Sequence, residues 1–86
     1  MQVLDIIQMS PKEVFIVGNL DGAVKPGLWE LRLNGEAVLT LEAVGEAQIQ
    51  GSAKGKLVPP RVVVCKGQVE KSRFDFTKDE VTLVKV

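Results

Sequence analysis

The sequence predicts a single all-β domain over residues 1–86, a small β-barrel of about six or seven short strands. In several segments apolar and polar residues alternate with a period of two, which is typical of strands that have one face in a core. Turn signals such as Lys25-Pro26-Gly27 and Asn34-Gly35 recur between these segments. No segment has the apolar spacing of a long helix, and 86 residues allow one domain with one modest core.

Residues 14–44 hold the clearest pattern of strands and turns, and the other segments are placed around them. Proline followed by glycine suits a type II turn, so we predict one at Pro26-Gly27. In the strand after this turn, three apolar side chains alternate with two charged ones: Trp29, Leu31 and Leu33 against Glu30 and Arg32. One face of this strand therefore belongs to the core, Trp29 included, and the other face meets water.

The hairpin at Asn34-Gly35 has two alternative registers. A two-residue loop pairs Leu33 with Glu36 and sets each apolar row beside a charged one. A three-residue loop with Gly35 in the left-handed conformation pairs Leu31 with Ala37 instead. We predict the three-residue loop, because it places all the apolar side chains of the next strand on the shared face: Ala37, Leu39, Leu41 and Ala43.

A resemblance to a known family lies in the same stretch. Residues 18–27 read Gly-x-Leu-x-x-Ala-Val-Lys-Pro-Gly, and an apolar alternating strand follows. This pattern resembles the second-domain β-barrel of translation GTPases, which commonly shows Gly-x-Val-x-x-Gly-x-x-Lys-x-Gly-Asp at the equivalent strand, turn and strand. The match covers roughly a third of the chain, and Leu28 stands where the family usually has an acidic residue. The resemblance implies a barrel more than a role in translation.

The first half of the chain contains two further strands. Residues 2–9 form a first strand that ends at Ser10-Pro11, because proline withholds a ladder donor. Residues 14–17 are apolar on both faces, as in a strand covered on each side, and Gly18 indicates a bulge or a sharp bend. After Val44 the strand pattern continues more weakly over residues 45–50.

The second half begins with a polar, glycine-rich loop over residues 51–56, followed by Pro59-Pro60. Residues 61–65 form its clearest strand. For residues 68–76 a helix and a strand are both compatible with the apolar spacing, and the alternation of Phe74 and Phe76 favours the strand. Residues 77–80 have the spacing of a capping box and predict one short helical turn, and residues 81–86 return to strand composition.

Composition places the chain among soluble proteins. It is 45% hydrophobic, too apolar for disorder, yet no apolar run is long enough to cross a bilayer. The first residues lack the features of a signal peptide, and the single cysteine has no internal partner for a disulfide. We therefore expect a cytoplasmic protein in a reducing compartment with no membrane partner.

The charges are balanced overall but unevenly distributed. Eleven basic and eleven acidic residues cancel, whereas residues 1–53 carry a net charge of −4 and residues 54–73 a net charge of +5. Chance segregation on a solvated surface is one explanation. A site for RNA, phosphate or an acidic protein is the other, and its candidate residues are Lys54, Lys56, Arg61, Lys66, Lys71 and Arg73.

Catalytic and metal-binding residues are scarce. The chain has no histidine and no tyrosine, and Cys65 ends an apolar strand, where an inert buried thiol is the usual outcome. Residues 51–56 are one residue short of a phosphate-binding loop, and Leu57 replaces the required serine or threonine. We expect no cofactor, no metal and no enzymatic activity.

The sequence therefore predicts a non-catalytic binding module that uses the basic stretch to engage RNA or an acidic protein. The alternative is a structural or assembly protein that forms homo-oligomers through exposed strand edges near Met1 and Val86 and binds no nucleic acid. A thiol-dependent enzyme is a third, weaker hypothesis. Phe74 and Phe76, interleaved with Lys71 and Arg73, are aromatic candidates for base stacking, although half-buried strand positions explain them more simply.

Overall fold

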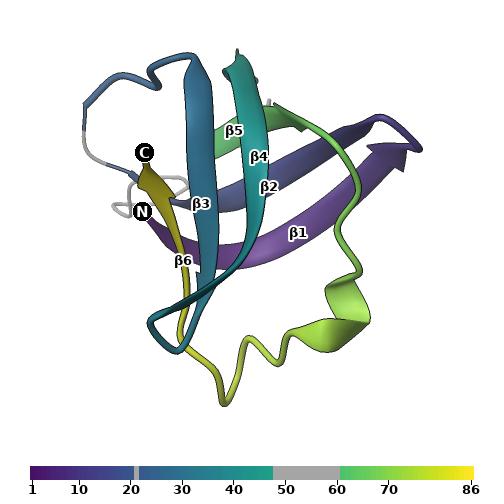
Figure 1. Cartoon of the computed structure of the whole chain (residues 1–86), viewed down its shortest axis with the longest axis vertical. Coiled ribbons are helices and arrows are strands. Elements are labelled where there is room, and N and C mark those ends of the chain that lie inside the picture. Colours follow the sequence, from purple (N-terminus) through teal and green to yellow (C-terminus); the bar gives the residue numbers. More distant parts are fainter. Residues whose placement is uncertain (21, 48–60) are drawn as a thin grey trace, which may run out of the picture.

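The computed structural model describes residues 1–20, 22–47 and 61–86, which form a closed six-stranded antiparallel barrel (Figure 1). The strands are arranged around the barrel in the order β1-β2-β5-β4-β3-β6. Their bounds are β1 (Gln2–Ser10), β2 (Glu13–Asn19), β3 (Gly27–Leu33), β4 (Glu36–Ala47), β5 (Arg61–Lys66) and β6 (Val81–Lys85), with one 3-10 turn, η1 (Lys71–Arg73), before β6. The prediction of a small all-β barrel is confirmed. The predicted loop at 51–56 and Pro59-Pro60 lie outside the described residues.

The barrel interior is filled by the inward side chains of all six strands. Trp29 is only 5% exposed, and its indole Nε1 donates a hydrogen bond of 2.8 Å to the carbonyl oxygen of Lys25. Its predicted place in the core is therefore confirmed. The predicted type II turn before it is wrong, because residues 23–26 form no regular turn and Gly27 opens β3 directly with a φ of 133°. The core comprises Val3, Ile6, Val14, Ile16, Trp29, Leu31, Leu41, Ala43, Val63, Cys65, Val69, Phe74, Val81 and Leu83.

The β3–β4 hairpin combines a tight turn with a bulge. Asn34 and Gly35 both have positive φ, 52° and 87°, as a two-residue type I′ turn requires, and Leu33 pairs with Glu36. The predicted three-residue loop is therefore wrong. The register then shifts at Val38, so that Leu31 pairs with Leu39 and Trp29 with Leu41. The predicted core face of this strand is therefore confirmed for Leu41 and Ala43, which are buried, and wrong for Ala37 and Leu39. The bulge packs Val38 against the core, while Ala37 and Leu39 are exposed.

Gly18 lies opposite an irregularity in its partner strand. The register of β1 and β2 shifts between Val3 and Asp5, so the bulge predicted near Gly18 falls on β1. The backbone oxygen of Gln2 approaches Gly18 so closely that any Cβ there would collide with it. Glycine is needed at this position because two backbones meet.

A short contact between β1 and β6 closes the barrel beside the two termini (Figure 1). Gln2 pairs with Thr82, and Met1 and Leu83 exchange two backbone hydrogen bonds of 3.0 and 2.9 Å. At the other end of β6, the amide of Val86 donates to the carbonyl oxygen of Leu28. The predicted unpaired terminal strands are therefore wrong.

Residues 67–80 form a strap across the gap that this short contact leaves between β1 and β6. The predicted strand at 68–76 is wrong: the strap contains η1, and its inward side chains, Val69 and Phe74, belong to the core. Residues 76–78 make a turn, but it is organised by Asp75, whose carboxylate accepts hydrogen bonds from the amide and hydroxyl of Thr77. The predicted capped helical turn starting at Thr77 does not form. The strap buries apolar surface where no strand is available.

Asn34 also joins the hairpin to the end of the strap. Its amide donates to the carbonyl oxygen of Glu80 at 2.7 Å, and its side-chain Oδ1 accepts from the amide of Glu80 at 2.9 Å. Asparagine is favoured here twice, because it tolerates a positive φ and offers an acceptor.

We expect Asn34→Ala to lower the free energy of unfolding by about 2 kcal/mol, since it combines left-handed strain with the loss of a hydrogen bond. Asn34→Gly removes only the side-chain bonds and is expected to cost about 1 kcal/mol. Urea unfolding followed by Trp29 fluorescence measures both values. Equal losses for the two variants would show that the backbone conformation contributes nothing.

Candidate functional site

The four predicted basic residues that the structure describes lie at separate places on the barrel. Lys54 and Lys56 lie outside the described residues. Arg61 begins β5 and Lys66 ends it, so their backbones are roughly 16 Å apart along the strand. Lys71 and Arg73 lie on η1, in the strap beyond the end of β5 (Figure 1).

Arg61 is engaged within the barrel. Its Nε and Nη2 atoms contact the two carboxylate oxygens of Glu46, each at 2.6 Å. Its Nη1 atom donates to the carbonyl oxygens of Leu20, at 3.0 Å, and Gly22. The guanidinium lowers the pKa of Glu46 by hydrogen bonding to its charged form. Arg61 thus ties β4 to the segment that follows β2, which is a structural role.

Lys71 and Arg73 differ in their surroundings. The ammonium of Lys71 lies 2.6 Å from Asp5 Oδ1 and lowers the pKa of that carboxyl, chiefly through this hydrogen bond. The pair joins η1 to β1. Arg73 is exposed and, among the described residues, makes no ion pair; it borders a small pocket of about 220 Å³ whose apolar lining includes Val38, Leu39 and Phe74.

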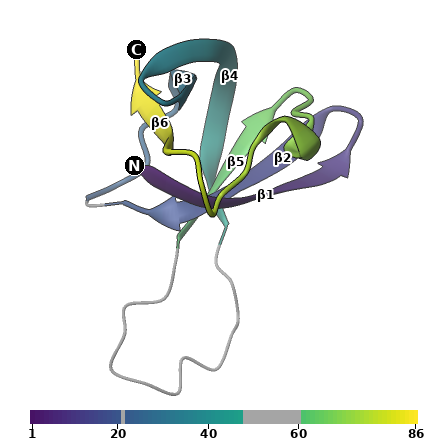
Figure 2. The same ribbon diagram turned by 90° about the horizontal axis from the view of Figure 1, so that it is seen from below.

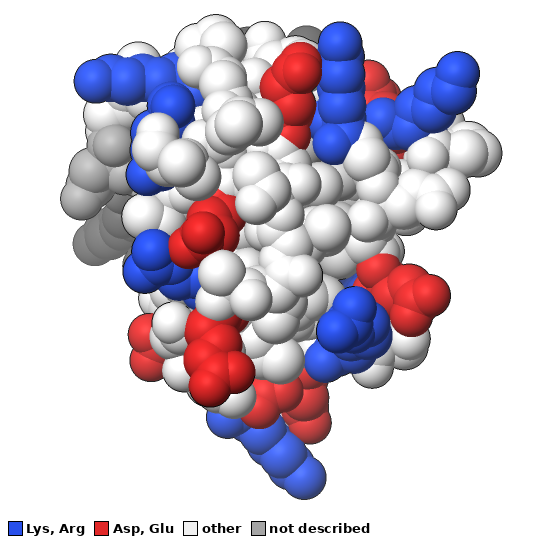
Figure 3. Space-filling view, viewed as in Figure 1, with Lys and Arg blue, Asp and Glu red and all other residues white. Residues whose placement is uncertain are grey.

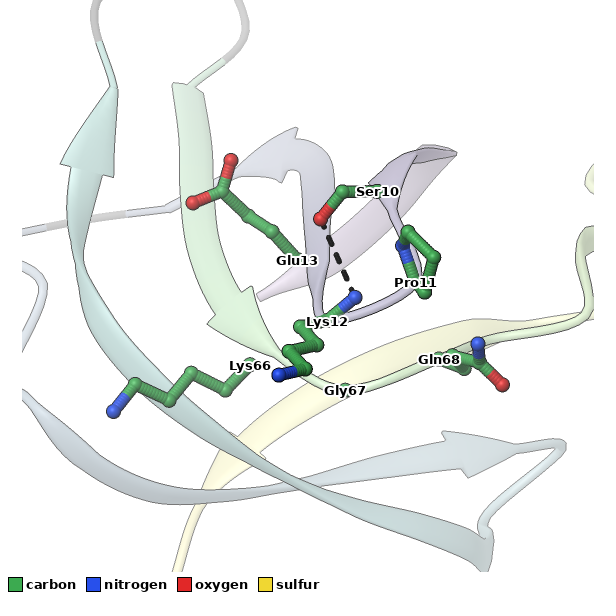
Figure 4. A pocket seen from close by; sticks show the side chains of 7 residues that line it. All are labelled: Ser10, Pro11, Lys12, Glu13, Lys66, Gly67 and Gln68. Atoms are coloured by element: carbon green, nitrogen blue, oxygen red, sulfur yellow. Dashed lines mark hydrogen bonds between the residues drawn. The ribbon is translucent and has the colours of Figure 1, made fainter.

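Lys66 lines the same depression as Lys12, a lysine outside the predicted basic stretch. Lys12, in the β1–β2 turn, and Lys66 both line an open depression of about 790 Å³ (Figure 4). They come together because β2 pairs with β5 up to the Glu13–Lys66 position. The depression is lined by Ser10, Pro11, Lys12, Glu13, Lys66, Gly67 and Gln68, and we call it the Lys12–Lys66 depression.

The backbone around this depression is held by one buttressing side chain, Gln8. Its Nε2 atom donates to three carbonyl oxygens, at 2.6 Å to Ser10, 3.0 Å to Glu13 and 2.9 Å to Gly67. Its Oε1 atom accepts from the amide of Val69 at 2.8 Å, and the Gly67 amide donates to the Lys12 carbonyl oxygen at 2.9 Å. Two turns that are distant in sequence are therefore fixed against each other.

The counter-charges at the depression are weak. Lys66 Nζ lies 3.8 Å from Glu42 Oε1, and both side chains are largely exposed, so the pair contributes little. Lys12 makes no ion pair within the described part of the chain. Elsewhere on the surface seen in Figure 3, acidic and basic side chains are interspersed, with uncharged surface between them. Among the predicted site residues that the structure describes, Lys66 is the one that lines a depression together with another lysine, Lys12.

Cys65 is fully buried in the core, as predicted for an inert thiol. Burial raises its pKa to about 11 from an ordinary value of 9.0, because desolvation disfavours the thiolate. Within residues 1–20, 22–47 and 61–86, no group of three or more cysteine, aspartate or glutamate side chains is arranged to hold a metal ion. In the same residues, no helix has the length and apolar character to cross a membrane.

No family model, curated protein or solved structure matches this chain. The resemblance to the second domain of translation GTPases stays a prediction. The functional proposal below therefore rests on the geometry of the barrel.

We expect Cys65 to react with a thiol reagent only when the protein unfolds, since neither access nor thiolate is available in the folded state. Because the folded pKa is raised, the contribution of Cys65 to stability is complete below pH 9.0 and is lost as the pH rises towards about 11. Urea unfolding at a series of alkaline pH values measures this decline, and Cys65→Val is expected to lessen it. Rapid labelling of the folded protein would contradict the prediction and revive the thiol-enzyme hypothesis.

We expect Arg61→Lys to lower the urea midpoint, because lysine cannot contact Glu46 with two nitrogens and still reach the Leu20 carbonyl. Glu46→Gln should cause a loss that overlaps with it, so the double variant is less destabilised than the sum of the two. The pKa of Glu46 is lowered in the fold, so this stability is present above pH 4.5 and fades as the pH falls below it. Strict additivity at neutral pH would show that the pair does not act as a unit.

Proposed function

We propose that this protein is a non-catalytic binding module that engages RNA at the Lys12–Lys66 depression. One observation carries the proposal: Lys12, in the β1–β2 turn, and Lys66, at the end of β5, border one open depression that Glu13 also lines. Among the described residues Lys66 makes one wide ion pair, with Glu42, and Lys12 makes none. Lysine ammonium groups of this kind attract phosphates without reading sequence. Two flexible cations can follow a nucleic acid backbone while the rigid turns beneath them stay in place.

The neighbouring strap supports the proposal through Arg73, which makes no ion pair among the described residues, whereas Lys71 is paired with Asp5. Lys71 and Arg73 follow Lys66 along the same segment, next to the β1–β2 side of the barrel (Figure 1). Arg73 is exposed, and a guanidinium can donate to a phosphate with two nitrogens. Lys54 and Lys56 enter the proposal as predicted contacts from outside the described residues. Phe74 is buried and packs near Phe76 with ring centroids 6.3 Å apart, so base stacking on Phe74 is not part of the proposal.

We expect binding to a mixed pool of single-stranded RNA that weakens steeply as salt is added. The double variant Lys12→Gln/Lys66→Gln should bind roughly tenfold more weakly, and the slope of log affinity against log salt should fall by about 1.4, the value for two lost phosphate contacts. Filter binding or fluorescence anisotropy at a series of salt concentrations measures both quantities.

The matched control is Lys25→Gln/Lys78→Gln, which removes the same charge from exposed positions away from the depression. If this control loses as much affinity as Lys12→Gln/Lys66→Gln, the loss depends on net charge alone, and the assigned site is contradicted. Absence of RNA binding at low salt would overturn the proposal, and an acidic protein would then be the next partner to test.

A further inference from the structure

An apolar row crosses the outer surface of the barrel. The strand registers align Ile7 on β1 with Phe15 on β2, Phe15 with Val64 on β5, and Val64 with Gly45 on β4. These side chains point away from the core, because their chain neighbours Ile6, Ile16 and Val63 point into it. Met9 and Val44 flank the row and are 52% and 44% exposed. We call the five side chains Ile7, Met9, Phe15, Val44 and Val64 the outer apolar face.

The barrel does not need this face for its own core. Outward positions of a strand are normally polar when they meet water. The hairpin of β3 and β4 has Glu30, Arg32 and Glu42 at such positions, beside the exposed Leu28 and Leu39. In the middle of β1, β2 and β5 the corresponding positions are apolar instead, at Ile7, Phe15 and Val64, and Ile7 is 43% exposed. Phe15 and Val64 are half-buried, and Ile7, Met9 and Val44 beside them are exposed. An apolar surface of this kind is typical of an interaction site.

The charged residues beside the row, Glu13 and Lys66, are complementary to the same two residues of a second copy of the chain. Glu13 and Lys66 are cross-strand neighbours on β2 and β5, one outward position along from Phe15 and Val64. A two-fold axis parallel to these strands and midway between them sets Phe15 of one copy against Val64 of the other. The same axis sets Glu13 of each copy against Lys66 of the other, twice in the dimer.

We infer that the outer apolar face is a dimerisation surface whose occupant is a second copy of this chain. The wide 3.8 Å separation between Lys66 and Glu42 leaves Lys66 able to contact Glu13 of the second copy as well. The barrel surface is convex, so the contact is a strip along β2 and β5 rather than a broad plane (Figure 2). Such an interface lies below roughly 1,200 Å² in total, which is typical of weak, reversible association.

The test uses two charge variants, alone and mixed. In a Glu13→Lys homodimer two pairs of lysines face each other, and in a Lys66→Glu homodimer two pairs of glutamates do. We expect each variant alone to associate at least about tenfold more weakly than wild type. In an equal mixture, the introduced lysine faces the introduced glutamate and the native pair is kept, so association should return to within about threefold of wild type. Sedimentation velocity between about 1 μM and about 1 mM measures the dissociation constants.

Two controls accompany this test. Glu36→Lys and Lys78→Glu change the same charges at exposed positions away from β2 and β5, and their mixture should behave as two wild-type proteins do. Ile7→Lys, with circular dichroism to confirm the fold, should abolish association through the apolar row.

Rescue in the mixture is an effect that a purely intramolecular role of Glu13 and Lys66 cannot produce, because each variant chain keeps its own like-charged pair. A wild-type protein that stays monomeric up to about 1 mM would overturn the inference, as would a dimer that none of these variants weakens. A monomer that binds a different protein through Ile7 would assign the face to that protein and equally overturn it. RNA retention is measured separately, so the failure of either proposal is visible on its own.

Discussion

The contact between β1 and β6 is the interaction on which the rest of this structure depends. A sheet of six strands closes into a barrel only if its first and last strands meet, and here they meet through Gln2, Thr82 and the backbone of Met1 and Leu83. Without this contact both strands would present unpaired amides and carbonyls to water and to other chains. Closure pairs these two strand ends, but most of β1 still has no strand partner on the side that faces β6.

The strap over residues 67–80 covers the side of the barrel where β1 and β6 are not paired, and it also positions part of the candidate site. Val69 and Phe74 fill the open side of the core, Lys71 pairs with Asp5 on β1, and Gln8 satisfies the backbone where the strap leaves β5. The same Gln8 side chain fixes the β1–β2 turn that carries Lys12. The proximity of Lys12 to Lys66 is therefore a consequence of how the barrel is closed.

Sequence reasoning recovered what depends on local alternation and missed what depends on closure. The core positions Trp29, Leu31 and Leu41 follow from a period of two. The bulge at Val38 cannot be predicted from this period. A bulge adds one residue to β4, so the residues between the turn and Val38 point to the opposite face from the one that the alternation predicts. Residues 68–76 were expected to form a strand because Phe74 and Phe76 alternate, yet the barrel is already closed and only a strap fits.

The candidate site was hard to predict for a related reason. The six basic residues were grouped by their closeness in sequence, whereas their pairing is set by acids from other strands: Glu46 for Arg61, Asp5 for Lys71 and, weakly, Glu42 for Lys66. Lys12 lies in an acidic half of the sequence and joins the depression only through the register of β2 and β5. The distribution of charge along the sequence therefore does not predict the distribution of charge on the surface of this barrel.

The two proposals share Lys66, whose ammonium has three donors and can contact a carboxylate and a phosphate together. The proposed two-fold axis along β2 and β5 would set both depressions at the same end of the dimer, so self-association would bring the two Lys12–Lys66 pairs close together. If both proposals hold, binding of a polyanion and pairing of the barrels would be linked, and each would change the affinity of the other by the same factor.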